Sequence, residues 1–235
     1  VSNMLQSTAA AAERVFEFLE EEEEAQTAEN AVSTEGLTGE VTFDHVRFGY
    51  TPEKIIINDF SCKVKPGQTV AIVGPTGAGK TTMVKLLMRF YDVNGGSICL
   101  DGHDVRRFNR GQLREMFGMV LQDAWLFDGT IAENIAYGRP EATREEIIAA
   151  AEMARMDHFV RTMPQGYDTH VENDAENISQ GQRQLLTIAR VILCDPKILI
   201  LDEATSSVDT RTERDIVRAM ETLMHCLLYT SDAAD

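Results

Sequence analysis

The sequence predicts an α/β domain, and three segments carry that prediction. The first is the apolar run 69–73, Thr-Val-Ala-Ile-Val, which leads directly into a glycine-rich turn and an amphipathic helix. The second is the apolar run 198–201, which ends in the acidic pair Asp202 and Glu203. Between these two runs, the segment 130–161 has helical periodicity. Continuous apolar strands that alternate with helices are typical of a parallel sheet covered on both faces.

The glycine-rich turn has the residues that a phosphate group requires. Its residues are Gly74, Pro75, Thr76, Gly77, Ala78, Gly79, Lys80, Thr81 and Thr82. Glycines let the backbone curl so that successive N–H groups point at phosphate oxygens, and the following helix adds its positive N-terminal end. In this pattern Lys80 reaches the terminal phosphates of a nucleotide, and the Thr81 hydroxyl is placed to bind Mg²⁺. We therefore expect a nucleotide-phosphate site here.

The acidic pair supplies the second part of such a site. Asp202 and Glu203 follow the strand predicted at 198–201, and ligands of parallel sheets bind beyond the carboxyl ends of the strands. Asp202 is placed to hold Mg²⁺, directly or through water. Glu203 points elsewhere and is the expected general base that polarises the attacking water. A strand that ends in two solvated acids is common. The pair therefore indicates a catalytic site only in combination with the phosphate loop.

A third motif lies between the helical segment and the acidic strand. Residues 177–184, Asn-Ile-Ser-Gln-Gly-Gln-Arg-Gln, place Ser179 as an N-cap before an apolar helix. The motif resembles the signature sequence of ATP-binding cassette (ABC) proteins, which contacts the terminal phosphate of a nucleotide held by the opposite subunit. The contacts that this resemblance implies come from Ser179, Gln180, Gly181 and Gln182. Gln180 departs from the commonest form, and this change occurs in exporter subunits that work as unequal pairs.

Further positions of the ABC family match this sequence one by one. Tyr50 matches the aromatic residue that stacks on adenine. Gln122, after the strand predicted at 118–121, matches the glutamine that touches Mg²⁺ or the attacking water and senses the transmembrane part. Asp209 matches an aspartate that reaches across the dimer, and the acidic segment 172–176 loosely matches one that touches the membrane domain.

The resemblance covers about residues 40–225 and best fits the cassettes of bacterial multidrug or lipid exporters. It implies a P-loop NTPase core with a mixed sheet, an antiparallel β subdomain and an inserted helical subdomain that carries the signature motif. The phosphate loop and the signature then belong to different sites in one chain. A head-to-tail dimer, of identical or different chains, would sandwich each ATP between Lys80 of one chain and Ser179 of the other.

The implied activity is ATP hydrolysis that drives transport, with ATP and Mg²⁺ as cofactors. Lys80, Gln122 and Glu203 are its expected catalytic residues, and Thr81, Gln122 and Asp202 its expected metal ligands. Two other functions stay open. A cassette ATPase acting on ribosomes or DNA is disfavoured by the acidic balance and the single cassette. A cassette that binds nucleotide without hydrolysing it is the other alternative.

Composition limits the binding partners and the cellular compartment that the chain is expected to have. The chain has 235 residues, 43% of them hydrophobic, and a formal net charge of -16. Residues 1–40 hold ten Glu and one Arg, a net -9, which leaves -7 for residues 41–235. Because neither part has a basic stripe, nucleic-acid binding is disfavoured. The four cysteines have neither metal-site nor disulfide spacing, which indicates a reducing compartment.

The two ends of the chain differ from the cassette pattern. A helix predicted at 7–19 resembles the end of an exporter's last membrane helix, so residues 1–24 are expected to be that cytoplasmic end and 25–39 a linker. The nucleotide-binding domain, 40–225, is expected to lack its last strands. The tail 226–235 resembles a translated sequencing adapter.

These expectations describe a piece of a larger exporter. Its membrane domain would belong to the same parent chain and would hold the cassette at the cytoplasmic face of the plasma membrane. No apolar run of the sequence reaches the about 20 residues that span a bilayer, so the fragment itself is expected to be soluble. Without its last strands, it is expected to bind ATP but to hydrolyse it poorly.

Overall fold

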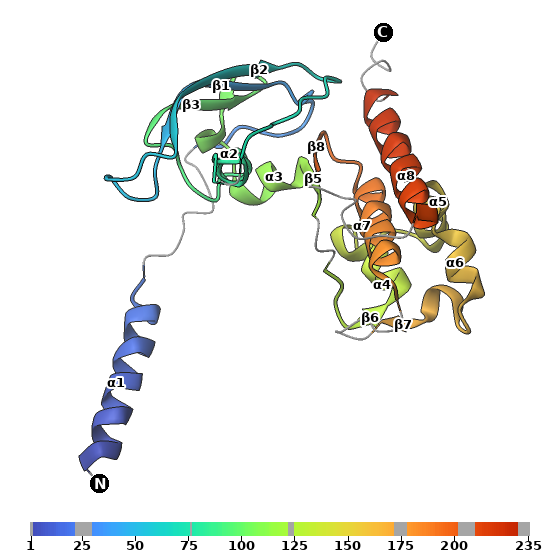
Figure 1. Ribbon diagram of the computed structural model, residues 1–235, viewed down its shortest axis with the longest axis horizontal. Coiled ribbons are helices and arrows are strands. Elements are labelled where there is room, and N and C mark those ends of the chain that lie inside the picture. The colour runs from blue at the N-terminus through green and yellow to red at the C-terminus, as the bar shows by residue number, and fades with distance from the viewer. Residues whose placement is uncertain are drawn as a thin grey trace.

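Antiparallel and parallel pairs of strands alternate with helices along this chain (Figure 1). The computed structural model describes residues 2–21, 30–75, 77–121, 125–171, 178–201 and 210–229. An antiparallel sheet has two short helices beside it, a parallel pair of strands follows, and a group of helices forms the other part of the molecule. The predicted α/β class, with its antiparallel and helical subdomains, is confirmed.

Four strands form the antiparallel sheet, in the order β2-β1-β3-β4. Their bounds are Val41–Phe48 (β1), Ile57–Val64 (β2), Gly95–Leu100 (β3) and His103–Asp104 (β4). Within β1, Val41 lies opposite Val64 on one side and Leu100 on the other. A register shift follows Phe43, and His45 there has a left-handed φ of 46°. This bulge moves the buried positions of β1 by one residue, so both halves of the strand face one core.

Two short helices pack against this sheet and carry the phosphate loop and its supports. They are α2 (Lys80–Leu87) and α3 (Arg110–Glu115), and the 3₁₀ turn η1 (Val105–Arg107) precedes α3. Met83 and Leu86 of α2 share a hydrophobic core with Ile98 of β3 and Leu113 of α3. The apolar face that the sequence predicts for α2 therefore anchors the phosphate-loop helix to the sheet.

The parallel pair consists of β5 (Phe117–Val120) and β8 (Ile198–Leu201), which confirms the strands predicted at 118–121 and 198–201. Val120 and Leu201 lie opposite each other, so both strands end at the same edge. The prediction that β8 is covered on both faces is wrong, since its residues are half-buried and Leu201 is exposed. In the described part of the chain β8 pairs with one strand, so less of its surface is covered than in a wide parallel sheet.

The run 69–73 is not the buried strand that its composition predicts. Residues 69–75 have no regular secondary structure, and the side chains of Val70, Ile72 and Val73 are 51%, 48% and 87% exposed. A strand forms only where a neighbour pairs with its backbone N–H and C=O groups. Among the residues that the structure describes, no strand pairs with this run, and its apolar side chains stay open to solvent.

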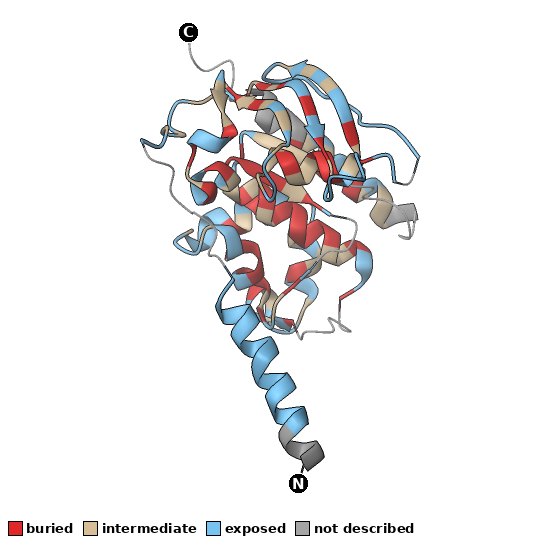
Figure 2. Ribbon diagram, turned by 90° about the vertical axis from the view of Figure 1, so that its left-hand side faces the viewer, coloured by how far each residue is buried: buried red, intermediate tan, exposed pale blue. Residues whose placement is uncertain are grey.

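The helical part is built around α7 (Gln180–Cys194), which is buried along most of its length (Figure 2). The other elements are the antiparallel strand pair β6 (Gly129–Thr130) and β7 (His170–Val171), the helices α4 (Ile131–Ile135), α5 (Arg144–Met153), α6 (Asp157–Thr162) and α8 (Thr210–Tyr229), and the 3₁₀ turns η2 (Ala136–Gly138) and η3 (Gly166–Asp168). α7 packs on α4, α5, α8 and β5, and this confirms the helices predicted at 130–161 and after Ser179. α8 continues beyond residue 225, where the sequence predicts that the domain stops.

The helix predicted at 7–19 is present and longer, as α1 (Ser2–Leu19). It projects away from the other elements, with Phe16, Phe18 and Leu19 exposed (Figures 1 and 2). Within the described ranges, no helix has the length and apolar content needed to cross a membrane. The chain is attached to the sheet again at Asp101, whose carboxylate accepts hydrogen bonds from the N–H groups of Thr38, Gly39 and Glu40.

Candidate nucleotide-binding site

The phosphate loop ends in a tightly curled backbone at the start of α2. Gly77 and Gly79 have φ angles of 85° and 90°, in the left-handed region that glycine adopts without steric cost. The N–H of Ala78 donates to the carbonyl of Pro75 at 3.1 Å, which closes a turn. The first N–H groups of α2 have no acceptor inside the helix, so this end can bind an anion.

Lys80 folds back over the loop that precedes it. Its ammonium donates to the carbonyl oxygens of Gly74 and Pro75, at 2.6 and 3.2 Å. Phosphate oxygens bear a charge and accept stronger hydrogen bonds than neutral carbonyls, so an entering phosphate can replace these two acceptors. Next along α2, the Thr81 side chain is exposed and Thr82 is buried. Thr76, which belongs to the same predicted loop, lies outside the described residues.

Tyr50 lies beside the phosphate-loop helix, although 32 positions separate it from Thr82 in the sequence. The two hydroxyl oxygens are 3.3 Å apart. The Tyr50 ring packs edge-on against Phe48 and Tyr91, with centroid distances of 5.0 and 5.1 Å. The ring remains 46% exposed and can still receive a flat partner. Its stacking on adenine stays a prediction, but its position next to α2 fits that role.

Sequence reasoning missed Tyr91 and Asn94, which hold this corner of the site. The Asn94 side-chain oxygen accepts from the Gly49 N–H at 2.7 Å, and the Asn94 N–H donates to the carbonyl of Arg47 at 2.9 Å. Tyr91 and Asn94 follow α2 in the sequence, and the fold places them against the end of β1. The available sequence signal is the Asn-Gly turn pattern at 94–95, which marks a return of the chain but does not identify its partner.

The signature motif caps α7 in the way that its sequence predicts. The Ser179 hydroxyl accepts from the N–H of Gln182 at 3.3 Å, and the Gln182 side-chain oxygen accepts from the N–H of Ser179 at 2.9 Å. This reciprocal capping box fixes the start of the helix. Ser179 and Gln180 are exposed and Gly181 is buried. The exposed helix start can therefore face a partner molecule.

The structure does not bring the phosphate loop and the signature motif together. α2 packs in the core beneath the antiparallel sheet, whereas α7 packs in the separate core of the helical part. Figure 1 shows the two helices well apart. Lys80 and Ser179 of one chain therefore do not face one common site.

Several predicted site residues lie outside the described part of the chain. They are Gln122, Asp202, Glu203 and Asp209, together with the acidic segment 172–176. The structure does describe the strand ends that precede two of them. Val120 and Leu201 are paired in register, two positions before Gln122 and one before Asp202. The roles of these residues stay predictions.

A group of three aromatic side chains lies after the segment that holds Gln122, and sequence reasoning missed it. Trp125, Phe127 and Tyr137 form this aromatic group, with centroid distances of 5.4 to 6.3 Å. Arg190 of α7 lies over the Tyr137 ring at 5.1 Å and donates to the carbonyl of Asn134 at 2.9 Å. Burial lowers the pKa of the Arg190 guanidinium. Trp125 and Tyr137 are mostly exposed, so an apolar surface faces outward here.

Comparison with known proteins decides the family. The ABC transporter family matches residues 57–206, which include both the phosphate loop and the signature motif. The chain belongs to the ABC transporter family. As an ABC chain it carries the nucleotide-binding P-loop fold, and its relatives are exporter-type proteins that join an ATP-binding part to a permease part.

Three relatives show how far this similarity extends. The fatty acid ABC transporter ATP-binding/permease proteins of Mycobacterium bovis and Mycobacterium tuberculosis are each 58% identical over 221 residues, which are 94% of this chain and 35% of each relative. A putative multidrug export ATP-binding/permease protein of Bacillus subtilis is 46% identical over 223 residues, 94% of this chain and 38% of the relative.

A solved structure supports the same conclusion. It is described as a bacterial Atm1-family ABC exporter with ATP bound, and it superposes with a TM-score of 0.81 at 41% identity. The superposition covers 93% of this chain and 38% of the exporter chain. This ABC chain thus spans little more than a third of the length of the relatives that it matches.

Proposed function

We propose that this ABC chain binds MgATP and hydrolyses it to drive transport by an exporter. The observation that carries the proposal is the arrangement around α2, where Lys80 closes on the glycine-rich loop and Tyr50 is tied to the same helix. The glycine-rich loop and a half-exposed aromatic ring thus lie at the same end of one helix. A nucleoside triphosphate has the two chemical parts that match them.

The proposed hydrolysis uses residues at three places. Lys80 and the α2 N-terminus would hold the terminal phosphates, while Thr81, Gln122 and Asp202 would hold Mg²⁺. Glu203 takes the proton of the water that attacks the γ-phosphorus, and ADP leaves. When bound, Mg²⁺ neutralises the charge that develops on the phosphate oxygens. The in-register ends of β5 and β8 support this assignment, because the strands that precede Gln122 and Asp202 in the sequence end at the same edge.

We also propose that the working unit is a head-to-tail dimer. Lys80 and Ser179 lie on helices of different cores, so a nucleotide on α2 is completed by a second ABC chain. Asp209 would reach across the same interface. Binding of ATP then favours the closed dimer, and hydrolysis releases it.

The aromatic group is the proposed contact with the permease part. Trp125, which follows the Gln122 segment in the sequence, and Tyr137, which packs against it, both expose apolar rings. The mycobacterial relatives are described as ATP-binding/permease proteins, and this chain matches only 35% of their length. A membrane domain docked here would be sensed by the Gln122 segment and would place the cassette at the cytoplasmic face of the membrane.

Direct measurement of nucleotide binding and hydrolysis tests the proposal. Wild-type protein should bind MgATP, Lys80→Ala should lose most of that affinity, and Glu203→Gln should bind ATP normally without hydrolysing it. Binding by calorimetry and release of inorganic phosphate give the two readings. Equal affinity of the wild type and Lys80→Ala would contradict the site. Binding without hydrolysis in the wild type would leave a cassette that only binds nucleotide.

A further inference from the structure

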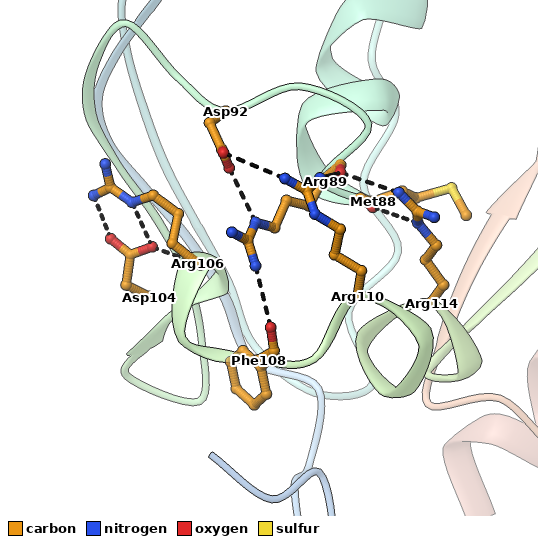
Figure 3. A network of polar contacts seen from close by, with 8 residues as sticks. All are labelled: Met88, Arg89, Asp92, Asp104, Arg106, Phe108, Arg110 and Arg114. Atoms are coloured by element: carbon orange, nitrogen blue, oxygen red, sulfur yellow. Dashed lines mark hydrogen bonds and ion pairs between the residues drawn. The ribbon is translucent and has the colours of Figure 1, made fainter. Parts of the chain in front are cut away.

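Two arginines of α3 bind the backbone directly after α2, at its C-cap Met88 and at Arg89 (Figure 3). The Arg110 guanidinium donates to the carbonyl of Arg89 at 2.6 Å. The Arg114 guanidinium donates to the carbonyl of Met88 at 3.3 Å and to that of Arg89 at 3.2 Å. Carbonyls at the end of a helix have no partner within it, and cations there favour the negative end of the helix dipole.

An acid and an aromatic ring complete this arrangement. Asp92 accepts from the Arg89 side chain at 3.0 Å and lies 3.5 Å from the Arg110 guanidinium. Arg114 lies over the Phe90 ring at 4.5 Å. The Arg110 side chain is only 9% exposed, so solvent screens its contacts weakly. We refer to Arg89, Asp92, Arg110 and Arg114 as the α2 clamp.

The clamp connects α2 to the base of the parallel strand pair. α3 ends at Glu115 and β5 begins at Phe117, so one residue separates the clamp's helix from the strand. That residue, Met116, accepts a hydrogen bond from the N–H of Ile198 in β8 at 2.9 Å. The clamp therefore ties the phosphate-loop helix to the two strands that lead toward Gln122 and Asp202.

We propose that Arg110 and Arg114 are positioning residues for nucleotide binding. They act through α2: by fixing its C-terminal end against α3, they fix where its N-terminal end presents Lys80 to the phosphates. This inference rests on the proposed MgATP site. Without the clamp the helix has to be ordered when the nucleotide binds, and part of the binding free energy is then used for that ordering.

Arginine suits this role better than lysine. A guanidinium presents several N–H donors in a rigid plane and can bond two acceptors at once, whereas an ammonium is a compact charge on a flexible stem. Arg114 bonds two carbonyls, and Arg110 contacts one carbonyl and the Asp92 carboxylate. Lysine at either position should therefore restore only part of the effect of arginine.

Arg106 is a matched control within the same surface region (Figure 3). Its guanidinium is paired with Asp104, with N–O distances of 2.9 and 2.5 Å. Its side chain is 46% exposed, and its partner lies on β4 rather than on α2. Arg106→Met thus removes an arginine and an ion pair from the same region without releasing α2.

The test compares affinities for MgATP among purified variants of the chain. Calorimetry is done at a temperature where far-UV circular dichroism shows every variant folded. Arg110→Met and Arg114→Met should each weaken binding by about tenfold. The corresponding lysine variants should fall between these and the wild type, and Arg106→Met should bind as the wild type does.

The outcomes distinguish a failure of the clamp proposal from a failure of the proposed nucleotide site. Wild-type affinity in folded Arg110→Met and Arg114→Met, with binding lost in Lys80→Ala, would overturn the clamp proposal and leave the proposed function standing. Wild-type affinity in Lys80→Ala would overturn both. If Arg110→Met does not fold, Asp92→Asn tests the same contact from a half-exposed position. It should weaken binding two- to threefold at roughly constant stability, and an unchanged affinity would count against the clamp.

Discussion

The Lys80 ammonium lies 2.6 Å from the carbonyl oxygen of Gly74, so the first residue of α2 closes on the first glycine of the loop. Both partners belong to the same nine-residue segment, 74–82, and the contact depends on the curled backbone between them. The same helix is bonded to Tyr50 near its start and to Arg114 at its end. The phosphate loop is therefore held by a contact within itself and by two contacts to the helix that follows it.

Replacing Gly79 by alanine should damage the loop. Gly79 has a φ of 90°, and an added Cβ would lie 3.0 Å from Cγ2 of Ile56. We expect a loss of about 1–2 kcal/mol in the free energy of unfolding and weaker MgATP binding. Gly111→Ala is the control, because Gly111 lies in α3 with open space around its Cβ position. It should leave stability unchanged or raise it, as urea unfolding of both variants will show.

Tyr91 should contribute to the binding of a nucleotide's base and not to the binding of its phosphates. Its ring supports Tyr50 edge-on at 5.1 Å, and such pairs contribute about 0.5–1.5 kcal/mol. Tyr91→Ala should therefore weaken ATP binding about two- to tenfold, with the affinity for inorganic tripolyphosphate unchanged. Tyr91→Phe keeps the ring and should bind ATP normally. A parallel loss for both ligands in Tyr91→Ala would show a general disturbance of α2 instead.

Ser179 should have a role beyond its capping of α7. Removing an N-cap hydroxyl costs about 1 kcal/mol of stability, and Thr143 caps α5 with the same reciprocal box. Ser179→Ala and Thr143→Ala should thus lose similar stability in thermal unfolding. Only Ser179→Ala should impair ATP-dependent association of two chains. Equal association in the two variants would reduce Ser179 to a structural cap.

The capping glutamates should make stability depend on acid pH. A hydrogen bond from the Thr130 N–H, followed by one from its hydroxyl, lowers the pKa of Glu133 below the ordinary value of 4.5. The unfolded chain then binds a proton more readily than the folded chain. The contribution of Glu133 is present above pH 4.5 and is lost as the pH falls from there through the folded pKa. Urea unfolding between pH 7 and pH 3 should show a shallower loss in Glu133→Gln than in the wild type.

Local sequence patterns were sufficient for some parts of this fold. Ser179 followed three residues later by Gln182 predicts the start of α7, because the capping box involves only neighbours in the chain. The apolar segment 198–201 predicts β8, and it forms a strand because β5 pairs with it. Whether the run 69–73 forms a strand also depends on residues far away in the sequence. An identical apolar pattern is a strand where another strand pairs with it and an exposed segment where none does.

The residues that support the site could not be predicted from the sequence, for the same physical reason. Nothing near Arg110 in the sequence indicates that its partner is the carbonyl of Arg89, 21 positions away. The contact of Tyr50 with Tyr91 likewise depends on how the chain returns after α2. Motif residues are recognisable because ligand chemistry restricts their types, whereas the residues that hold them are set by tertiary packing.

A mixing experiment tests the two-chain site most directly. In the Glu203→Gln background, chains with Lys80→Ala and chains with Ser179→Ala each lack one half of every shared site. A mixed dimer regains one intact site, formed by Lys80 of one chain and Ser179 of the other. Sedimentation with ATP should show little dimer for either variant alone and clear recovery of dimer in an equal mixture. No recovery in the mixture, with both variants folded and the parent dimeric, would contradict the shared site.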